Sequence, residues 1–258
     1  MLNMPPHTYA LDSSWRTLLS DLGVKPADVL RRAGLVDDLL QQPSVRLSQN
    51  DYYRFWQSVE AETGHPVFPV RLCQAIRSES FSPALFAALC SPNLLVAAQR
   101  ISRYKPLVGP MRLDVTEGRG TIRFEISWLN TGLLPPTSLV ITELLFFVLV
   151  ARMGTRAHVC PIQVTTFPLP SPVAPYEEFI GARIEPGAQH RLVFTQADAT
   201  RPFLTSNDSL WAAFEPELRQ RLATLDSSGN GFEHSYHLLD CLSLLLGHTK
   251  VAILHRRF

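Results

Sequence analysis

The hydrophobic period of this chain changes at Pro110, and this change constrains the fold more than any other feature. Over 94–104, apolar residues recur at the helical spacing i, i+3, i+4 and i+7. Over 111–115 and 122–128, apolar and polar residues alternate on either side of the turn 117–120, which contains two glycines. Alternation around a glycine-rich turn predicts a β-hairpin with one buried face. The sequence therefore predicts an α+β fold.

Helices are expected throughout the first half of the chain. Ser48 is the predicted N-cap of one helix, and Asp51 stands where it would complete a capping box. The pairs Ser82-Pro83 and Ser91-Pro92 are expected to begin two more helices, because serine caps an N-terminus and proline fits the first helical position. The ranges predicted as helical are 12–22, 26–33, 48–63, 67–76, 83–89 and 92–105.

The second half adds a central helix and more strands. Residues 137–153 are apolar nearly all round, which predicts a buried helix that ends at Gly154. The other expected elements are strands at 162–166 and 191–195, a short helix at 176–180, a turn or short strand at 181–186, and a last helix from Asn207 to Leu225. We thus expect a helical N-terminal half packed with a small, mostly antiparallel sheet and the central buried helix.

Composition favours a soluble protein with a sizeable core. The 258 residues are 46% hydrophobic and 18% charged, which disfavours disorder. A formal net charge of +1 provides no overall field toward nucleic acid or an anionic membrane. The cysteines at 73, 90, 160 and 241 are scattered, as is typical of reduced thiols. Neither a signal peptide nor a run of about 20 apolar residues is found, so we expect a cytoplasmic location and no membrane partner.

Catalytic and metal-binding motifs do not emerge from the sequence. It has no G-x-S-x-G, H-E-x-x-H, P-loop or G-x-G-x-x-G pattern. His234 and His237, beside Glu233, offer two imidazoles without a third ligand, and a solvated helix face is the simpler explanation. Glu143, within the apolar helix, either reports a ligand or is bonded to a neighbouring backbone group or arginine. We therefore expect no catalytic residue, no metal and no cofactor.

Two blocks of sequence each carry a recognisable order of residues. The first block, 91–110, contains Ser91, Pro92, Leu94, Ala97, Arg103, Tyr104 and Leu107. The second, 167–203, contains Phe167, Pro172, Tyr176, Phe179, Ile180, Gly181, Ile184, Leu192, Phe194 and Pro202.

In these positions the chain resembles the N-terminal sensor domains of one branch of AraC/XylS-type transcription regulators, often labelled an arabinose-binding-like domain. Upstream of the first block, VLRRAGL (29–35), Phe55-Trp56 and Thr63-Gly64-His65-Pro66 also fit the family, whereas Phe68-Pro69 departs from it. His190 stands where the family commonly has asparagine or a similar polar residue.

The resemblance implies an effector-sensing and dimerisation domain of a transcription regulator. In such regulators a basic region with two helix-turn-helix units follows the sensor domain and needs on the order of a hundred residues. Here only 232–258 follow the linker-like segment 226–231, so we expect the DNA-binding part to be absent, truncated or replaced. We expect 1–226 to be the sensing and oligomerisation domain and 227–258 a linker with a truncated or atypical tail. The alternative is a stand-alone small-molecule binding protein with no role at DNA.

Candidate site residues follow from this interpretation. An effector pocket needs amphipathic walls, and an arginine would bind an anionic effector with two hydrogen bonds. The ligand-binding candidates are Trp56, Arg103, Tyr104 and Trp128, although core packing explains each aromatic equally well. A self-complementary apolar stripe on the last helix would serve both partners of a homodimer, unless it packs on the chain's own sheet. The dimerisation candidates on that stripe are Leu210, Phe214, Leu218 and Leu222.

Overall fold

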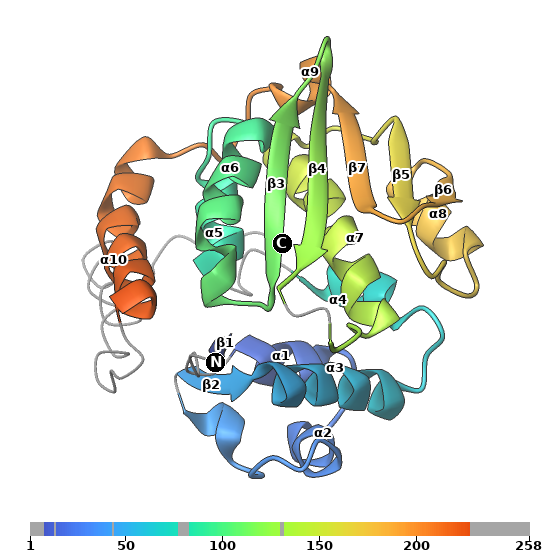
Figure 1. Cartoon of the computed structure of the whole chain (residues 1–258), viewed down its shortest axis with the longest axis vertical. Coiled ribbons are helices and arrows are strands. Elements are labelled where there is room, and N and C mark those ends of the chain that lie inside the picture. The colour runs from blue at the N-terminus through green and yellow to red at the C-terminus, as the bar shows by residue number, and fades with distance from the viewer. Residues whose placement is uncertain (1–7, 13, 43, 77–82, 130–131, 228–258) are drawn as a thin grey trace, which may run out of the picture.

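A five-stranded sheet stands above a helical N-terminal part in the computed structural model, which describes residues 8–12, 14–42, 44–76, 83–129 and 132–227 (Figure 1). The expected α+β class is confirmed. The N-terminal part comprises β1 (Thr8–Asp12), α1 (Ser14–Asp21), α2 (Pro26–Arg32), the 3-10 helix η1 (Leu39–Gln41), β2 (Ser44–Ser48) and α3 (Gln49–Thr63).

The third helix begins where its capping box predicts. The Ser48 hydroxyl accepts a hydrogen bond from the Asp51 backbone N–H at 3.2 Å, and α3 then runs to Gly64, whose φ of +56° suits a glycine. Its face of Tyr52, Phe55, Trp56 and Val59 is buried, as expected. The antiparallel pair β1 and β2 was not predicted, and the helix expected from residue 12 begins at Ser14 because Thr8–Asp12 pairs with Ser44–Ser48.

The main sheet contains the predicted hairpin. β3 (Met111–Glu117) pairs with β4 (Thr121–Trp128) in an antiparallel register that places Leu113 opposite Ile126. The remaining strands are β5 (Gln163–Thr166), β6 (Ile184–Pro186) and β7 (His190–Thr195), and the strand order is β3-β4-β7-β5-β6. Only β5 and β6 pair in parallel, so the sheet is mostly antiparallel, as expected.

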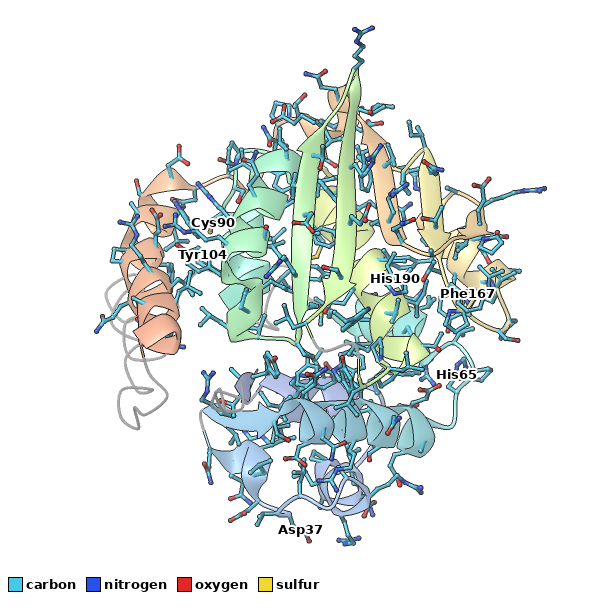
Figure 2. All side chains as sticks on the ribbon, in the orientation of Figure 1. Asp37, His65, Cys90, Tyr104, Phe167 and His190 are labelled. Carbon is cyan, nitrogen blue, oxygen red and sulfur yellow. The ribbon has the colours of Figure 1, made fainter. Side chains whose placement is uncertain are left out.

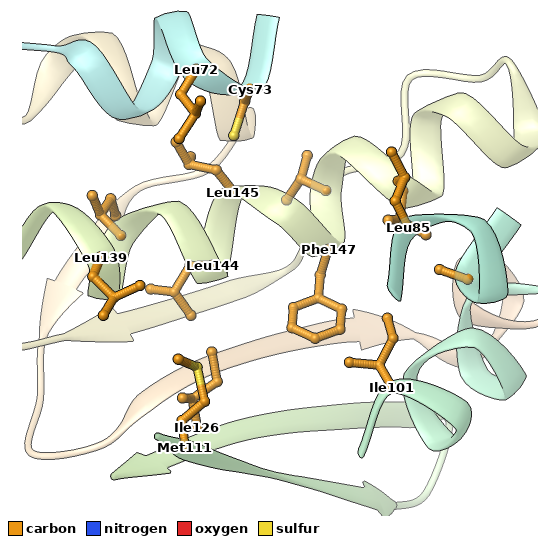
Figure 3. Packing of buried hydrophobic residues seen from close by; sticks show 14 of the residues in the cluster. Leu72, Cys73, Leu85, Ile101, Met111, Ile126, Leu139, Leu144, Leu145 and Phe147 are labelled. Atoms are coloured by element: carbon orange, nitrogen blue, oxygen red, sulfur yellow. The ribbon is translucent and has the colours of Figure 1, made fainter. Parts of the chain in front are cut away.

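The central helix α7 (Thr137–Thr155) lies between the sheet and α4 (Phe68–Ala75), and Figure 3 shows both contacts. Leu144 and Phe147 are directed toward the sheet, whereas Leu145 is directed toward Leu72 and Cys73 of α4. Burial on both sides explains why α7 is apolar nearly all round. It is long and apolar enough to cross a membrane, but most of it is buried inside this fold.

Two further predicted helix boundaries were wrong. α7 continues past Gly154 to Thr155, and its C-cap residue Arg156 adopts a left-handed φ of 52°. A Cβ atom at Gly154 would lie only 2.5 Å from the Phe203 ring. Glycine is therefore needed here so that Phe203 can pack closely against α7, and it does not end the helix. α6 (Leu94–Tyr104) is capped by Asn93, whose side chain accepts from the Val96 N–H at 3.0 Å, and not by Ser91.

The last described helix, α10 (Asp208–Ser227), lies at the edge of the molecule beside α5 (Pro83–Leu89) and α6, away from the sheet (Figure 1). The helix was predicted to start at Asn207 and begins one residue later, where the Asn207 side chain accepts from the Leu210 N–H at 2.9 Å. The elements that complete the fold are the 3-10 helix η2 (Lys105–Leu107), α8 (Ala174–Ile180) and α9 (Gln196–Ala199).

Candidate functional site

The four ligand-binding candidates lie in two separate places. Trp56 on α3 and Trp128 at the end of β4 belong to aromatic contacts near the junction of the helical part and the sheet. Arg103 and Tyr104, at the end of α6, face α10. The structure therefore brings Arg103 and Tyr104 together beside α10, whereas Trp56 and Trp128 have different ring partners, and the four candidates do not line one cavity.

The first place is built around Trp128. Its ring lies 6.2 Å from that of Tyr53 and 6.3 Å from that of His190, which stands on the neighbouring strand β7 (Figure 2). The His190 Nδ1 is 2.9 Å from the Thr166 hydroxyl, and burial lowers the pKa of His190. The indole nitrogens of Trp56 and Trp128 are buried and lack a hydrogen-bond partner among the described residues. Each of these indole N–H groups is an unsatisfied donor that a polar ligand atom could accept from, although the two rings have different aromatic neighbours.

The second place is the contact between α10 and the pair α5 and α6. The Phe214 ring packs edge-on against Phe86 at 4.7 Å, and the Trp211 ring covers the Arg100 guanidinium at 4.0 Å. The Glu215 carboxylate accepts a hydrogen bond from Arg219 at 2.8 Å. Three side chains of one helix thus supply a ring, a carboxylate and an apolar anchor to a neighbouring surface.

Arg103 joins this contact through charge. Its guanidinium lies 3.7 Å from the Glu215 carboxylate and 5.6 Å from the centre of the Tyr104 ring. The Arg219 hydrogen bond, with further attraction from Arg103 and Arg100, lowers the pKa of Glu215. Three cationic side chains therefore surround one carboxylate.

A cavity of about 20 Å³ lies under α10, which is room for about one water molecule. The Tyr104 side chain is 7% exposed, and its hydroxyl has no hydrogen-bond partner in the described part of the chain. The Arg219 guanidinium approaches that hydroxyl without the geometry of a bond. The residues that line the cavity are Ala87, Arg100, Ile101, Tyr104, Lys105, Leu107, Val108 and Leu218.

A buried ion pair connects this cavity to the centre of the protein. The Lys105 ammonium lies 2.5 Å from the Glu143 carboxylate, and the two side chains are 9% and 11% exposed. Glu143 is therefore a bonded carboxylate, although its partner is a lysine and not an arginine. Because Lys105 lines the cavity, this ion pair links the cavity wall to the central helix α7.

The Cys73 thiol lies near this ion pair. Burial, with a smaller effect of the Glu143 charge, raises the pKa of the Cys73 thiol above its ordinary range.

The dimerisation candidates have different surroundings. Phe214 and Leu218 are buried against α5, α6 and η2 of the same chain, whereas Leu210 and Leu222 are half-buried. The inner part of the stripe therefore packs within its own chain, on helices and not on the sheet. The side chain of Leu225 lies outside the described residues.

Sequence reasoning missed four side chains of the α6–α10 contact. They are Arg100, Lys105, Trp211 and Glu215. Arg100 and Arg103 are three residues apart, and Trp211 and Glu215 are four apart, so each pair shares one helix face. That spacing was available in the sequence, but nothing in it places the two faces against each other.

Metal chemistry receives no support from the described residues, where no three His, Cys, Asp or Glu side chains gather. The weak candidates Glu233, His234 and His237 lie outside the described residues. Cys73, Cys90 and Cys160 are free thiols, and Cys241 also lies outside the described part.

The described residues thus form an α+β body with a peripheral helix, α10, packed over a small cavity. The chain belongs to the family described as the arabinose-binding domain of AraC transcription regulators, N-terminal, whose model matches residues 23–203. Domains of this family are regulatory sensors of transcription regulators and not enzymes. The resemblance found in the sequence is therefore confirmed.

A solved structure has the same fold. The crystal structure of the transcriptional regulator CdpR from Pseudomonas aeruginosa aligns with a TM-score of 0.56 at 14% sequence identity, covering 83% of this chain and 66% of that chain. At such identity the likeness concerns the fold alone. The chain spans less than two thirds of the length of that regulator, and no curated protein sequence matches it.

Proposed function

We propose that this chain is the effector-sensing and dimerisation domain of an AraC-like transcription regulator. It binds a small molecule in the cytoplasm and controls transcription through a DNA-binding domain that lies outside the described residues. The family match over residues 23–203 carries this proposal. The protein of similar fold is a transcriptional regulator, which supports the same role.

The position of α10 supports a sensing role. This helix closes the cavity beside Arg103 and Tyr104 and is the last described element before 228–258. A ligand that shifts α10 would therefore also shift the start of the segment that follows this helix. We propose that 1–226 is the sensing and oligomerisation domain and that 227–258 is the linker and tail. Trp56 and Trp128 are proposed as walls of a second ligand-binding region.

We propose that α10 also contributes to a homodimer. Phe214 and Leu218 hold the helix on its own chain, and Leu222 packs partly against the same small cluster, so Leu210 and the exposed part of Leu222 remain for a partner. A twofold interface uses the same patch on both partners, so these two leucines would meet their own copies or each other.

The test joins the full chain to a DNA-binding domain that represses a reporter only as a dimer. We expect repression by the wild-type fusion and its loss in Leu210→Glu, because a glutamate at a twofold contact is buried without a partner. The matched control is Leu134→Glu, since Leu134 is 87% exposed and lies outside α10. Light scattering on the chain itself should give the mass of two protomers, and a monomer at tens of micromolar would refute the dimer.

The effector part has a separate test. A ligand that binds only the folded state raises the melting temperature. Amino acids, fatty acids and aromatic acids should be screened for such a shift with the full chain. A hit should also change repression by the fusion, whereas a compound that raises the melting temperature without changing repression does not act as an effector.

A further inference from the structure

The contact between α10 and α6 has the composition of a ligand in its binding site. α10 presents the Glu215 carboxylate to Arg103, the Trp211 ring to Arg100, and Leu218 to the cavity. These are the parts of one amphipathic molecule, an acid group attached to an apolar body. The surface that receives them has cations at its rim and apolar side chains at its floor.

The receiving surface is richer in donors than α10 can satisfy. Glu215 serves both Arg103 and Arg219, yet the Tyr104 hydroxyl remains unpaired although the residue is more than nine-tenths buried. An unpaired buried hydroxyl is costly, so a ligand oxygen that accepts from it gains more than the same bond would give at the surface. A carboxylate has the lone pairs to accept from this hydroxyl and from a guanidinium together.

α10 is held outside the main core. Its described ion pair and ring contacts to other elements are with α5 and α6, near Trp211, Phe214 and Glu215. Further along the helix, Leu218 and Leu222 pack on the small apolar cluster, and Arg221 pairs within the helix with Glu217 at 2.8 Å. A helix that packs only on a small separate cluster detaches more readily than one buried in the main core.

We propose that the effector is a hydrophobic monocarboxylate that binds in the cavity between α6 and α10 and displaces α10 by replacing Glu215. This proposal deepens the proposed function, on which it rests. The ligand carboxylate pairs with Arg100 and Arg103 and accepts from the Tyr104 hydroxyl. Its apolar body lies against the floor formed by Ile101, Leu107 and Val108.

The size of the cavity explains why binding and movement are coupled. About 20 Å³ admits one water and no effector, so the site opens only when α10 shifts. A ligand that binds only the open arrangement moves the equilibrium toward it. Because α10 precedes the linker, the position of α10 in the opened state changes the point from which the rest of the regulator continues.

The first experiment measures binding to the full chain by calorimetry with 3-phenylpropanoate, octanoate and the corresponding amides. We expect one of the two acids to bind about tenfold more tightly than its amide, since the charged group supplies the hydrogen bonds to arginine. The comparison of the two acids distinguishes an aromatic body from an aliphatic one. Equal binding of acid and amide would overturn the proposal, and so would the absence of binding by both acids.

The second experiment uses variants that we expect to change the affinity for the acid in opposite directions. Arg103→Gln and Tyr104→Phe should each weaken binding about five- to tenfold, because each removes a donor to the carboxylate. Glu215→Gln should strengthen binding several-fold, because it removes the carboxylate that competes with the ligand. Ala87→Leu should abolish binding by filling the cavity. The proposal fails if Glu215→Gln leaves the affinity unchanged or lowers it, whatever the other variants do.

The third experiment follows α10 itself by hydrogen exchange. With the acid bound, exchange of amides in 208–227 should accelerate while that of α6 slows, whereas a merely stabilising ligand would slow both. Slower exchange in α10 would contradict the displacement. If these tests fail while another compound changes repression by the fusion, the proposed function stands and this site is wrong. If the fusion never represses and the chain is monomeric, the proposed function itself fails.

Discussion

At the scale of single residues, the Lys105–Glu143 pair is the most consequential contact in the core. Both side chains are about nine-tenths buried, and the pair joins η2 to α7. Removing one partner of such a pair leaves a buried charge alone, so Lys105→Met should lower the free energy of unfolding by ~3–5 kcal/mol. Urea denaturation measures this loss.

The control for this pair is an exposed one. Arg31 pairs with Asp28 at 3.1 Å on the surface, and Arg31→Met should change stability by no more than about 0.5 kcal/mol. The double variant Lys105→Met/Glu143→Leu should recover much of the loss, because it leaves no unpaired charge. A Lys105→Met cost below about 1 kcal/mol would mean that the pair is open to water.

The buried His190 leads us to predict that the free energy of unfolding depends on pH. Burial lowers its pKa from the ordinary value of 6.5, so the unfolded chain binds its proton more readily than the folded one. The stabilisation from neutral His190 is therefore complete above about pH 6.5 and is lost as pH falls from there toward the folded-state pKa. His190→Asn should flatten this part of the curve of melting temperature against pH. Parallel curves for the two proteins would show that His190 does not contribute.

At the scale of elements, the sheet and α7 meet through Phe124. Its ring is 1% exposed and lies 5.2 Å from Phe147 and 5.5 Å from Phe194. Phe124→Ala should cost ~3–5 kcal/mol through lost burial and the cavity left behind. The control is Arg123→Ala, because Arg123 is exposed on the opposite face of β4 and its loss should cost less than about 0.5 kcal/mol. Chemical denaturation measures both losses. A larger loss for Arg123→Ala than for Phe124→Ala would show that the buried face of β4 has been assigned wrongly.

Elements with a strong local pattern could be predicted from the sequence. The hairpin of β3 and β4, the capped α3 and the apolar α7 each carry their own periodicity. β1 and β2 could not be predicted, because two five-residue strands far apart in sequence gain their stability from each other. Asn93 replaced Ser91 as the cap of α6 because Ser91 is occupied: it donates to the Ala87 carbonyl and accepts from Arg100.

The candidate site could be predicted only in part, for a related reason. Arg103 and Tyr104 were found because they belong to a recognisable motif, and both lie at the contact with α10. Glu215 and Lys105 could not be identified as site residues, because their ion-pair partners lie on other elements, more than 35 residues away in the sequence. Sequence periodicity reports which face a helix buries, but not which element covers that face.

At the scale of the whole molecule, the fold separates the α10 edge from a larger central core. α7, the sheet and the N-terminal helices form one continuous core, whereas the apolar cluster under α10 is separate and small. Stability therefore resides mainly in the larger core, and α10 can shift without unfolding the rest. The ion pair of Lys105 and Glu143 is the polar link between the two.

The surface charge of the whole chain leads to the last prediction, which is that this chain binds duplex DNA no better than a neutral protein does. Affinity for DNA grows with the number of phosphates that cations neutralise, and a net charge of +1 provides little surplus. On the sheet, Arg191 is already paired with Glu125 at 2.8 Å. We expect no change in the fluorescence anisotropy of a labelled duplex at about 0.15 M salt with tens of micromolar protein. The fusion described above provides the positive control, and salt-sensitive binding below one micromolar by the chain alone would show that it carries its own DNA-binding surface.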